Sequence, residues 1–359
     1  MASEARAFKT LPGLFAAGAI LLSFAPGVWA RSGMPASRGA AAGGDADGYG
    51  LDRDEAAAPE LKGPRFWFGR PDKDTAAEQL AHASRLEKAG SQRGARKAYN
   101  ALVHEWGDAP EAAEAQLGVA ALHEAAGNLV AAFREYQYFI EHYASGAEVN
   151  GLGYQKVVEQ QFAVANSLRD KLGGGWFSSP DVELVASMFR HIVRNAPEWS
   201  RAPECMMLEG SAYESEGMDA EAIVAYDALA SRYPASGLRL DALYRAGACR
   251  YRISEKFPRD ERSLNHALAA LSRAYREDPR HPMAETASKQ IAELSRRRAT
   301  MLFERAEFYD RIRDNPQAAL IAYEQFLAIC PASAEAPWVR DRVAQLKTLA
   351  GPSGADASK

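Results

Sequence analysis

The sequence is poor in the residues that build disulfide frameworks and cysteine zinc sites. Its 359 residues include three cysteines, Cys205, Cys249 and Cys330, which are widely spaced and contain no C-x-x-C pair. An odd number with this spacing excludes both a disulfide framework and a cysteine-ligated zinc ion. We expect each cysteine to be a small buried apolar residue.

An excess of positive charge is also missing. Lys and Arg number 43 against 47 Asp and Glu, which gives a net charge of -4. This balance excludes a dedicated nucleic-acid binder, whose domain carries a basic footprint. The chain is 47% hydrophobic, so it has enough apolar content for a large core.

The motifs of the common enzyme classes are absent or incomplete. His123-Glu124 begins a helical zinc motif, but Gly127 stands where the second histidine is needed. Residues 151–153 begin like a dinucleotide loop, but Lys156 occupies the third glycine position. The sequence contains no Gly-x-Ser-x-Gly motif and no phosphate loop, and its seven histidines show no ligand spacing. We therefore predict a protein that is not an enzyme and needs no cofactor or metal.

The first thirty residues have the pattern of a signal peptide. Arg6 and Lys9 precede an apolar run, Leu14 to Ala25, and Ala30 suits the small-residue rule for cleavage. The pattern predicts export, cleavage after Ala30 and a periplasmic mature protein. The uncharged stretch from Leu11 to Ala30 is also long enough to span a bilayer, so an uncleaved anchor is the alternative.

Two segments are too rich in small and polar residues to fold. We expect residues 31–74 to form a flexible tether and residues 350–359 a disordered tail. The tether contains an aromatic segment at residues 64–71, and we expect its Phe66-Trp67-Phe68 cluster to cover the open end of the folded part.

Residues 75–349 show apolar residues at helical spacing and an internal repeat. A small residue is followed by an aromatic or large apolar residue four positions later, an apolar residue seven later and a helix stop twelve later. The six units are Ala95, Tyr99, Leu102, Gly107; Ala132, Tyr136, Phe139, Ala144; Val185, Phe189, Ile192, Pro197; Ala222, Tyr226, Leu229, Pro234; Ala267, Leu271, Ala274, Pro279; and Ala319, Tyr323, Phe326, Pro331.

Each register lies on the second helix of a helix-turn-helix unit. Turn signals precede several units, at Gly90, Gly127, Gly217 and Asp314-Asn315, and a first helix precedes each turn. The units repeat at intervals of 37, 53, 37, 45 and 52 residues, against the usual tetratricopeptide period of about 34. Two long loops, expected at Lys171 to Asp181 and at Ser254 to Ser263, explain much of the excess. We therefore predict an all-α fold, a tetratricopeptide-like solenoid of about six helix-turn-helix units.

Two stretches resemble a known family. They run from Ala202 to Pro234 and from Phe303 to Tyr323, and they are similar to the outer-membrane assembly lipoprotein (BamD-like) family of tetratricopeptide-repeat proteins. The resemblance implies a periplasmic solenoid that helps to fold and insert outer-membrane β-barrel proteins. This chain departs from the family in two ways: it has no lipid-bearing cysteine after the signal peptide, and it has six units rather than five.

A solenoid of this type presents an extended concave surface lined by its first helices. We expect partner-binding residues on these helices and in one aromatic loop. They are Ser84, Glu87, Lys88, Glu114, Leu117, Ala121, Glu124, Trp176 and Phe177. A long helical stretch is expected from Met283 to Arg313. The three arginines at 296–298 within it spread over three helix faces, and we interpret them as solvated surface residues.

These observations favour a non-enzymatic periplasmic scaffold or client-binding protein in outer-membrane protein assembly. Its expected partners are protein or peptide clients, such as outer-membrane β-barrel proteins and their insertase. Nucleic acid is not expected, and any membrane association comes through partners. The alternatives are a Tol-Pal type envelope coordinator and the helical domain of a cell-wall enzyme that lacks its catalytic domain.

Overall fold

The computed structural model describes residues 69–144, 153–172 and 180–349, and these form thirteen α-helices, one π-helical turn and no β-strand. The helices are α1 (Ala76–Lys88), α2 (Gln92–Glu105), α3 (Pro110–Ala125), α4 (Leu129–His142), α5 (Tyr154–Arg169), α6 (Val182–Asn195), α7 (Ala202–Ser215), α8 (Asp219–Arg232), α9 (Arg239–Lys256), α10 (Glu261–Glu277), α11 (Ala284–Glu307), α12 (Pro316–Ile329) and α13 (Ala336–Leu349). The π-helical turn η1 (Phe308–Ile312) directly follows α11.

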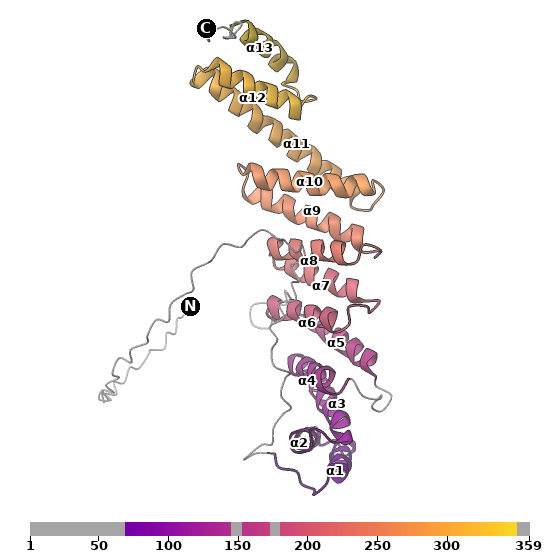
Figure 1. Cartoon of the computed structure of the whole chain (residues 1–359). Helices are drawn as coiled ribbons and strands as arrows, with labels where there is room; N and C mark the ends of the chain where they lie inside the picture. The colour runs from indigo at the N-terminus through magenta and orange to yellow at the C-terminus, as the bar shows by residue number, and fades with distance from the viewer. Residues whose placement is uncertain (1–68, 145–152, 173–179, 350–359) are drawn as a thin grey trace, which may run out of the picture. The chain divides into compact units, whose positions relative to one another are not determined.

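The helices follow one another in space in the same order as in the chain (Figure 1). Each helix packs against the next, so α1 to α12 form six pairs of a first and a second helix. First helices of neighbouring units are also in contact: α1 contacts α3, and α9 contacts α11. The predicted all-α, tetratricopeptide-like solenoid of six units is confirmed.

The repeat register marks the core of every unit. Its small, aromatic and apolar positions lie on the even-numbered helices α2 to α12, and none is more than 5% exposed. A small residue lets two helices approach closely, and the large residue one turn later fills the space between them. The register therefore identifies the buried face of each second helix from sequence alone.

Each second helix ends at the predicted stop. In all six units the last helical residue lies two positions before it, as Glu105 does before Gly107 and Asn195 before Pro197. Where the stop is proline, the residue before it avoids the helical region because the proline ring collides with its backbone. The residue after the helix then has extended or bridge-region backbone angles, as Ala196 shows at φ -129° and ψ 69°.

The turns within the units adopt the conformation that their residues favour. Gly90, Gly127 and Gly217 have φ values of +80°, +75° and +72°, and Asp314 has a φ of 44°. Glycine enters this left-handed region at little cost, and Asp is among the few other residues found there. Each of these residues reverses the chain between the two helices of one unit.

The apolar core divides into four clusters that share first helices. One cluster joins α1 to α3, the largest joins α3 to α9, a third joins α9 to α11, and the last joins α11 to α13. The sequence analysis did not single out α13. It packs Ala336, Val339, Val343 and Leu346 against the last pair and so covers the end of the core.

Three local predictions need correction. The expected loop from Ser254 to Ser263 is shorter, because α9 continues to Lys256 and α10 begins at Glu261. The single long helix expected from Met283 to Arg313 changes to π-helix at Phe308. The arginines at 296–298 are not uniformly solvated.

The three arginines have different environments. Arg296 is exposed and pairs with Glu293, in agreement with the prediction. Arg297 is half-buried and donates to the backbone carbonyls of Ser254 (2.9 Å) and Pro258 (3.3 Å), so it binds the carboxyl end of α9. Arg298 is also half-buried.

Several predictions concern residues outside the described part of the chain. They are the signal peptide at 1–30, the tether before residue 69 with its aromatic cluster, the tail at 350–359, and the site residues Trp176 and Phe177.

Candidate protein-binding groove

A tyrosine on the second helix reaches back to a carboxylate on the first helix in four of the six units. Tyr99 donates to Glu87 Oε2 (2.7 Å), Tyr136 to Glu124 Oε2 (2.8 Å) and Tyr226 to Glu214 Oε2 (2.8 Å). In all three units the carboxylate lies twelve residues before the tyrosine and three before the glycine of the turn. We call this arrangement the tyrosine–carboxylate pair.

The sixth unit has the same pair with one residue more between its members. Tyr323 donates to Asp310 Oδ2 (3.2 Å), thirteen residues earlier. The additional residue is accommodated by the π-helical turn, in which the Arg313 amide donates to the carbonyl of Phe308, five residues earlier. The π-turn thus keeps the acid within reach of its tyrosine.

Burial keeps these tyrosines protonated, so that they act as donors. It raises the pKa of Tyr99 to about 12, and it raises the pKa values of Tyr136, Tyr226 and Tyr323 further, each with a contribution from the neighbouring carboxylate. At neutral pH each hydroxyl therefore offers its proton to the acid.

Two glycines on first helices make room for the tyrosine rings. A Cβ atom at Gly210 would lie 2.4 Å from the ring of Tyr226, and one at Gly118 would lie 2.9 Å from the ring of Tyr99. Because real Cβ atoms do not approach this closely, the rings fit only beside glycine. Sequence reasoning missed both glycines and the role of the carboxylates. The repeated spacing Glu-x-x-Gly, with tyrosine nine residues after the glycine, is the signal that could have found the acids.

A groove opens beside the pair of the second unit. Its volume is about 540 Å³, and it lies between two neighbouring first helices, α3 and α5, with the second helix α4 behind them. The lining residues are Leu117, Ala121, Glu124 and Ala125 of α3, Tyr136 of α4, and Val157 and Gln160 of α5. Glu124 is the one charged residue in this lining, among the residues that the structure describes.

Three predicted site residues, Leu117, Ala121 and Glu124, therefore come together in the groove. Leu117 is only 6% exposed and belongs mainly to the core, so it contributes an apolar wall rather than a freely accessible side chain. Ala121 is exposed at the rim. The hydroxyl of Tyr136 holds the carboxylate of Glu124 at the edge of an apolar floor.

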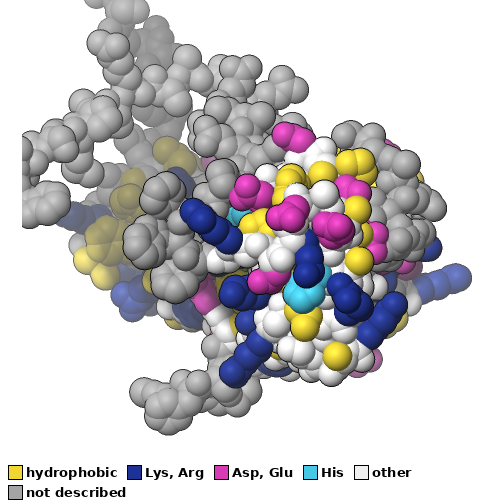
Figure 2. Space-filling model, turned by 90° about the horizontal axis from the view of Figure 1, so that it is seen from below, with side chains coloured by type: hydrophobic (Ala, Val, Ile, Leu, Met, Phe, Trp, Pro, Cys, Tyr) yellow, Lys and Arg dark blue, Asp and Glu magenta, His cyan; other side chains and the backbone are white. Residues whose placement is uncertain are grey.

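A second group of predicted residues surrounds Tyr99 instead. Its hydroxyl lies 3.2 Å from Ser84 Oγ and 2.7 Å from Glu87, and the charge of Glu114 also acts on it. Lys88 is exposed on the same helix as Glu87. The molecule viewed from the α1 end carries a group of acidic side chains on one side and Lys and Arg side chains elsewhere (Figure 2).

The carboxylates of the fourth and sixth units are neutralised by arginines that lie two α-helices further along the chain. Glu214 receives Arg245 Nη1 (3.0 Å) and Arg252 Nη2 (3.1 Å), both from α9. Asp310 receives two hydrogen bonds of 2.8 Å from Arg342 of α13. By contrast, within the described residues no basic side chain forms an ion pair with Glu87 or Glu124.

Other buried carboxylates in the middle of the chain are also paired. Glu209, 3% exposed, receives Arg190 Nη1 at 2.8 Å. Asp219, 4% exposed, receives Arg252 Nε at 2.7 Å and Lys256 Nζ at 2.9 Å. A buried carboxylate requires such partners because its desolvation is costly. These groups therefore have a structural role.

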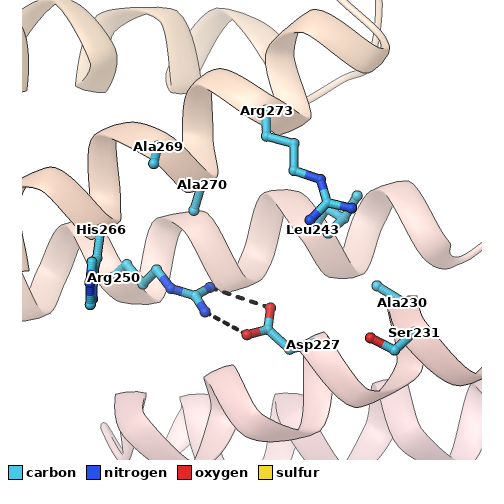
Figure 3. Close-up of a pocket in the computed structure, with 9 residues that line it drawn as sticks. All are labelled: Asp227, Ala230, Ser231, Leu243, Arg250, His266, Ala269, Ala270 and Arg273. Carbon is cyan, nitrogen blue, oxygen red and sulfur yellow. Dashed lines mark hydrogen bonds and ion pairs between the residues drawn. The ribbon is translucent and has the colours of Figure 1, made fainter. Parts of the chain in front are cut away.

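A second groove of about 630 Å³ is lined by the second helices α8 and α10 and by the first helix α9 (Figure 3). Arg250 forms an ion pair with Asp227 inside it, while Ala269 and Ala270 supply small side chains from α10. Arg273 and His266 also line this groove. Because Arg250 and Asp227 are paired with one another, neither charge is left unpaired for a ligand in this groove.

The described residues contain no cluster of His, Cys, Asp and Glu suited to a metal ion, and none of their helices is long and apolar enough to cross a membrane. All three cysteines are free and buried, as predicted, and burial raises the pKa of Cys205 and Cys249 to about 12.

The tetratricopeptide repeat family model matches residues 204–236, which include most of α7 and all of α8. This segment is therefore similar to a tetratricopeptide repeat. Because the same buried register recurs in every unit, the chain folds as a helical solenoid of the tetratricopeptide type. Such solenoids generally serve protein–protein interaction. The finer resemblance to the outer-membrane assembly lipoproteins is not part of this match.

The chain is similar to several solved structures, at low sequence identity and low TM-score. They include MamA (14% identity, TM-score 0.28, covering 58% of this chain and 95% of the other) and a tetratricopeptide repeat protein from Parabacteroides merdae (10%, 0.27, 76% and 98%). A third is the C-terminal part of a TPR repeat-containing protein from Cytophaga hutchinsonii (12%, 0.29, 75% and 88%). No curated protein sequence matches the chain.

Proposed function

We propose that the chain is a non-enzymatic binding protein that holds an extended client segment in the groove between α3 and α5. The single observation that carries this proposal is the groove itself. It combines an open volume of about 540 Å³, an apolar floor and one carboxylate whose orientation is fixed by a tyrosine. An extended segment fits such a site because its side chains enter the hollow while its backbone remains at the rim.

In this proposal the protein acts in the periplasm, in the assembly of outer-membrane β-barrel proteins. Two features of the sequence support the assignment: the signal-peptide pattern of residues 1–30, and the similarity of two helical units to the outer-membrane assembly lipoproteins. Precursors of β-barrel proteins cross the periplasm before they fold, so they present the extended segments that the groove accepts.

Site-specific photo-crosslinking in the source bacterium tests the proposal. A photoreactive amino acid at Ala121 stands at the rim of the groove, and the same amino acid at Ala292, an exposed alanine of α11, is the matched control. We expect Ala121, but not Ala292, to crosslink to β-barrel precursors or to their insertase. Recovery of Tol-Pal components at Ala121 would contradict the assignment to outer-membrane assembly and favour an envelope coordinator. Equal crosslinking at both positions would contradict a role for the groove.

Mass spectrometry of the protein purified from its source tests the assignment to the periplasm. We expect an amino terminus at Arg31 without acyl groups, because the sequence has no cysteine beside the cleavage site. An intact Met1, with extraction that depends on detergent, would establish an uncleaved anchor instead.

A further inference from the structure

The repeat contains its own example of what binds beside a tyrosine–carboxylate pair. In the fourth unit Glu214 accepts from Tyr226 and also from two arginines of α9, the first helix of the next unit. In the sixth unit Asp310 accepts from Tyr323 and from Nε and Nη2 of Arg342. In both units each carboxylate oxygen, including the one that accepts from the tyrosine, also accepts from a guanidinium group of the chain itself.

The second unit has the same pair without the arginine. Glu124 precedes Tyr136 by the same twelve residues as Glu214 precedes Tyr226, and the two hydrogen bonds have the same length of 2.8 Å. The following first helix, α5, contributes Val157 and Gln160 to the groove where α9 contributes arginines to Glu214. The position beside Glu124 is open in volume and lined by apolar and uncharged groups.

We propose that this position receives a lysine or arginine side chain of the bound client. The carboxylate of Glu124 provides the charge, while Leu117, Ala121 and Val157 provide apolar surface for the aliphatic stem of the incoming side chain. The client completes the contact that Arg245 and Arg252 complete internally at Glu214. This inference rests on the proposed function, because it specifies which side chain the client presents.

The geometry favours a basic side chain over an apolar one. An apolar group placed in the groove would remove water from the Glu124 carboxylate without replacing its hydrogen bonds, which is unfavourable. A guanidinium or ammonium group replaces them with charge-assisted bonds. Glu124 thus selects among the extended segments that the apolar floor would accept equally.

Selection from a peptide library tests the inference with the full-length mature protein. The probe is a library of ten-residue peptides randomised at every position, and the readout is the enrichment of each amino acid in the captured fraction. For the unmodified protein we expect enrichment of Lys and Arg at one peptide position by about tenfold, the factor that one charge-assisted hydrogen bond gives. In Glu124→Gln this enrichment should disappear while any preference for apolar residues at neighbouring positions remains.

Two further variants control the experiment. Glu111→Gln changes a carboxylate in the first turn of the same helix that does not line the groove, and it should keep the enrichment. Ala121→Arg places a guanidinium three residues before Glu124 on the same helix face, so it should abolish the enrichment by supplying the cation internally. Ala121→Arg also answers the question if Glu124→Gln does not fold, which circular dichroism will show.

The outcomes separate this inference from the proposed function. If Glu124→Gln retains the enrichment of Lys and Arg, Glu124 is not the recognising group and the inference is wrong. If the unmodified protein captures peptides with apolar preferences alone, the inference is wrong but the groove still binds clients. If capture by the unmodified protein equals capture by Ala121→Trp, in which an indole fills the groove, the proposed function is wrong as well.

Discussion

The second and fourth units share one design and differ in a single respect. Both contain a tyrosine buried against the core that donates to a glutamate twelve residues earlier, and both reverse the chain at a glycine in the left-handed region. In the fourth unit two arginines from the next helix complete the site, whereas in the second unit the site opens into a groove. The comparison separates what the repeat needs to fold from what is left for a partner.

The tyrosine contributes to folding in both units. Its ring fills the space between helices in both units, and its hydrogen bond satisfies a hydroxyl that would otherwise be buried without a partner. The carboxylate serves both folding and binding, because it accepts the hydrogen bond of the tyrosine and can still accept further hydrogen bonds. The arginines therefore decide whether a unit is closed or open.

The largest expected effect concerns the buried tyrosine that the second and fourth units share. Tyr136→Ala and Tyr226→Ala should each lower the free energy of unfolding by about 3 kcal/mol, because each removes a buried aromatic ring. Chemical denaturation measures both values, with the exposed substitution Lys347→Ala as a control near zero. A cost for Tyr136→Ala no larger than that of the control would show that the repeat register is wrong.

The next effect tests the difference between closed and open units. Asp310→Asn should cost about 2 kcal/mol, because Arg342 loses its partner at a carboxylate that is only 5% exposed. Glu124→Gln should cost less than about 0.5 kcal/mol, because an amide oxygen still accepts from Tyr136 and no internal cation depends on the charge. Urea unfolding of the two variants measures this contrast. Equal costs would mean that the open and closed units do not differ as described.

The glycines beside the tyrosine rings provide a test of where those rings lie in the core. Gly210→Ala should cost about 2 kcal/mol and Gly118→Ala about 1 kcal/mol, since the added Cβ atoms collide with Tyr226 and Tyr99 to different degrees. Gly237→Ala is the matched control, because a Cβ atom there meets nothing within 4 Å. Thermal unfolding followed by circular dichroism ranks the three. If Gly210→Ala is as stable as Gly237→Ala, the ring does not occupy the described position.

The smallest expected effect is a dependence of stability on pH in the sixth unit, whose carboxylate is paired with an arginine. The guanidinium of Arg342 lowers the pKa of Asp310, so the folded state binds this proton less readily than the unfolded state. The stabilisation from Asp310 is present above the unfolded pKa of about 4 and is lost as the pH falls through the folded pKa. The stability gap between the unmodified protein and Asp310→Asn should therefore narrow below pH 4, as urea unfolding across pH 2–6 would show. A constant gap would contradict the ion pair.

Much of the fold could be predicted from the sequence because the repeat register depends on local chemistry. The spacing from Ala222 to Tyr226 and Leu229 identifies a helix face, and Pro234 lies two residues after the end of that helix. The site was harder to predict. Ala121 and Glu124 could be placed on the exposed side of α3 by periodicity, but their approach to Val157 depends on how α5 packs against α3, which periodicity within one helix does not show.

Contacts between side chains of different units could not be predicted from the sequence either. Whether an acid meets an arginine thirty or more residues away, as Glu214 meets Arg245, depends on the angle between neighbouring units. Periodicity within one helix carries no information about that angle. Gly118 and Gly210 were also not predicted, because each accepts a tyrosine ring from another helix and periodicity within one helix does not show such a contact.

The π-helical turn after α11 has a consequence for the rest of the chain. One residue inserted into an α-helix rotates everything that follows by about 100° around the helix axis, because an α-helix has 3.6 residues per turn. Such a rotation would have carried Asp310 away from the face that meets Tyr323 and Arg342. The wider turn at Phe308–Ile312 absorbs the additional residue where it occurs. The carboxylate of Asp310 thus stays within hydrogen-bonding distance of Tyr323 and Arg342, one residue later in the chain than the spacing of the other units would place it.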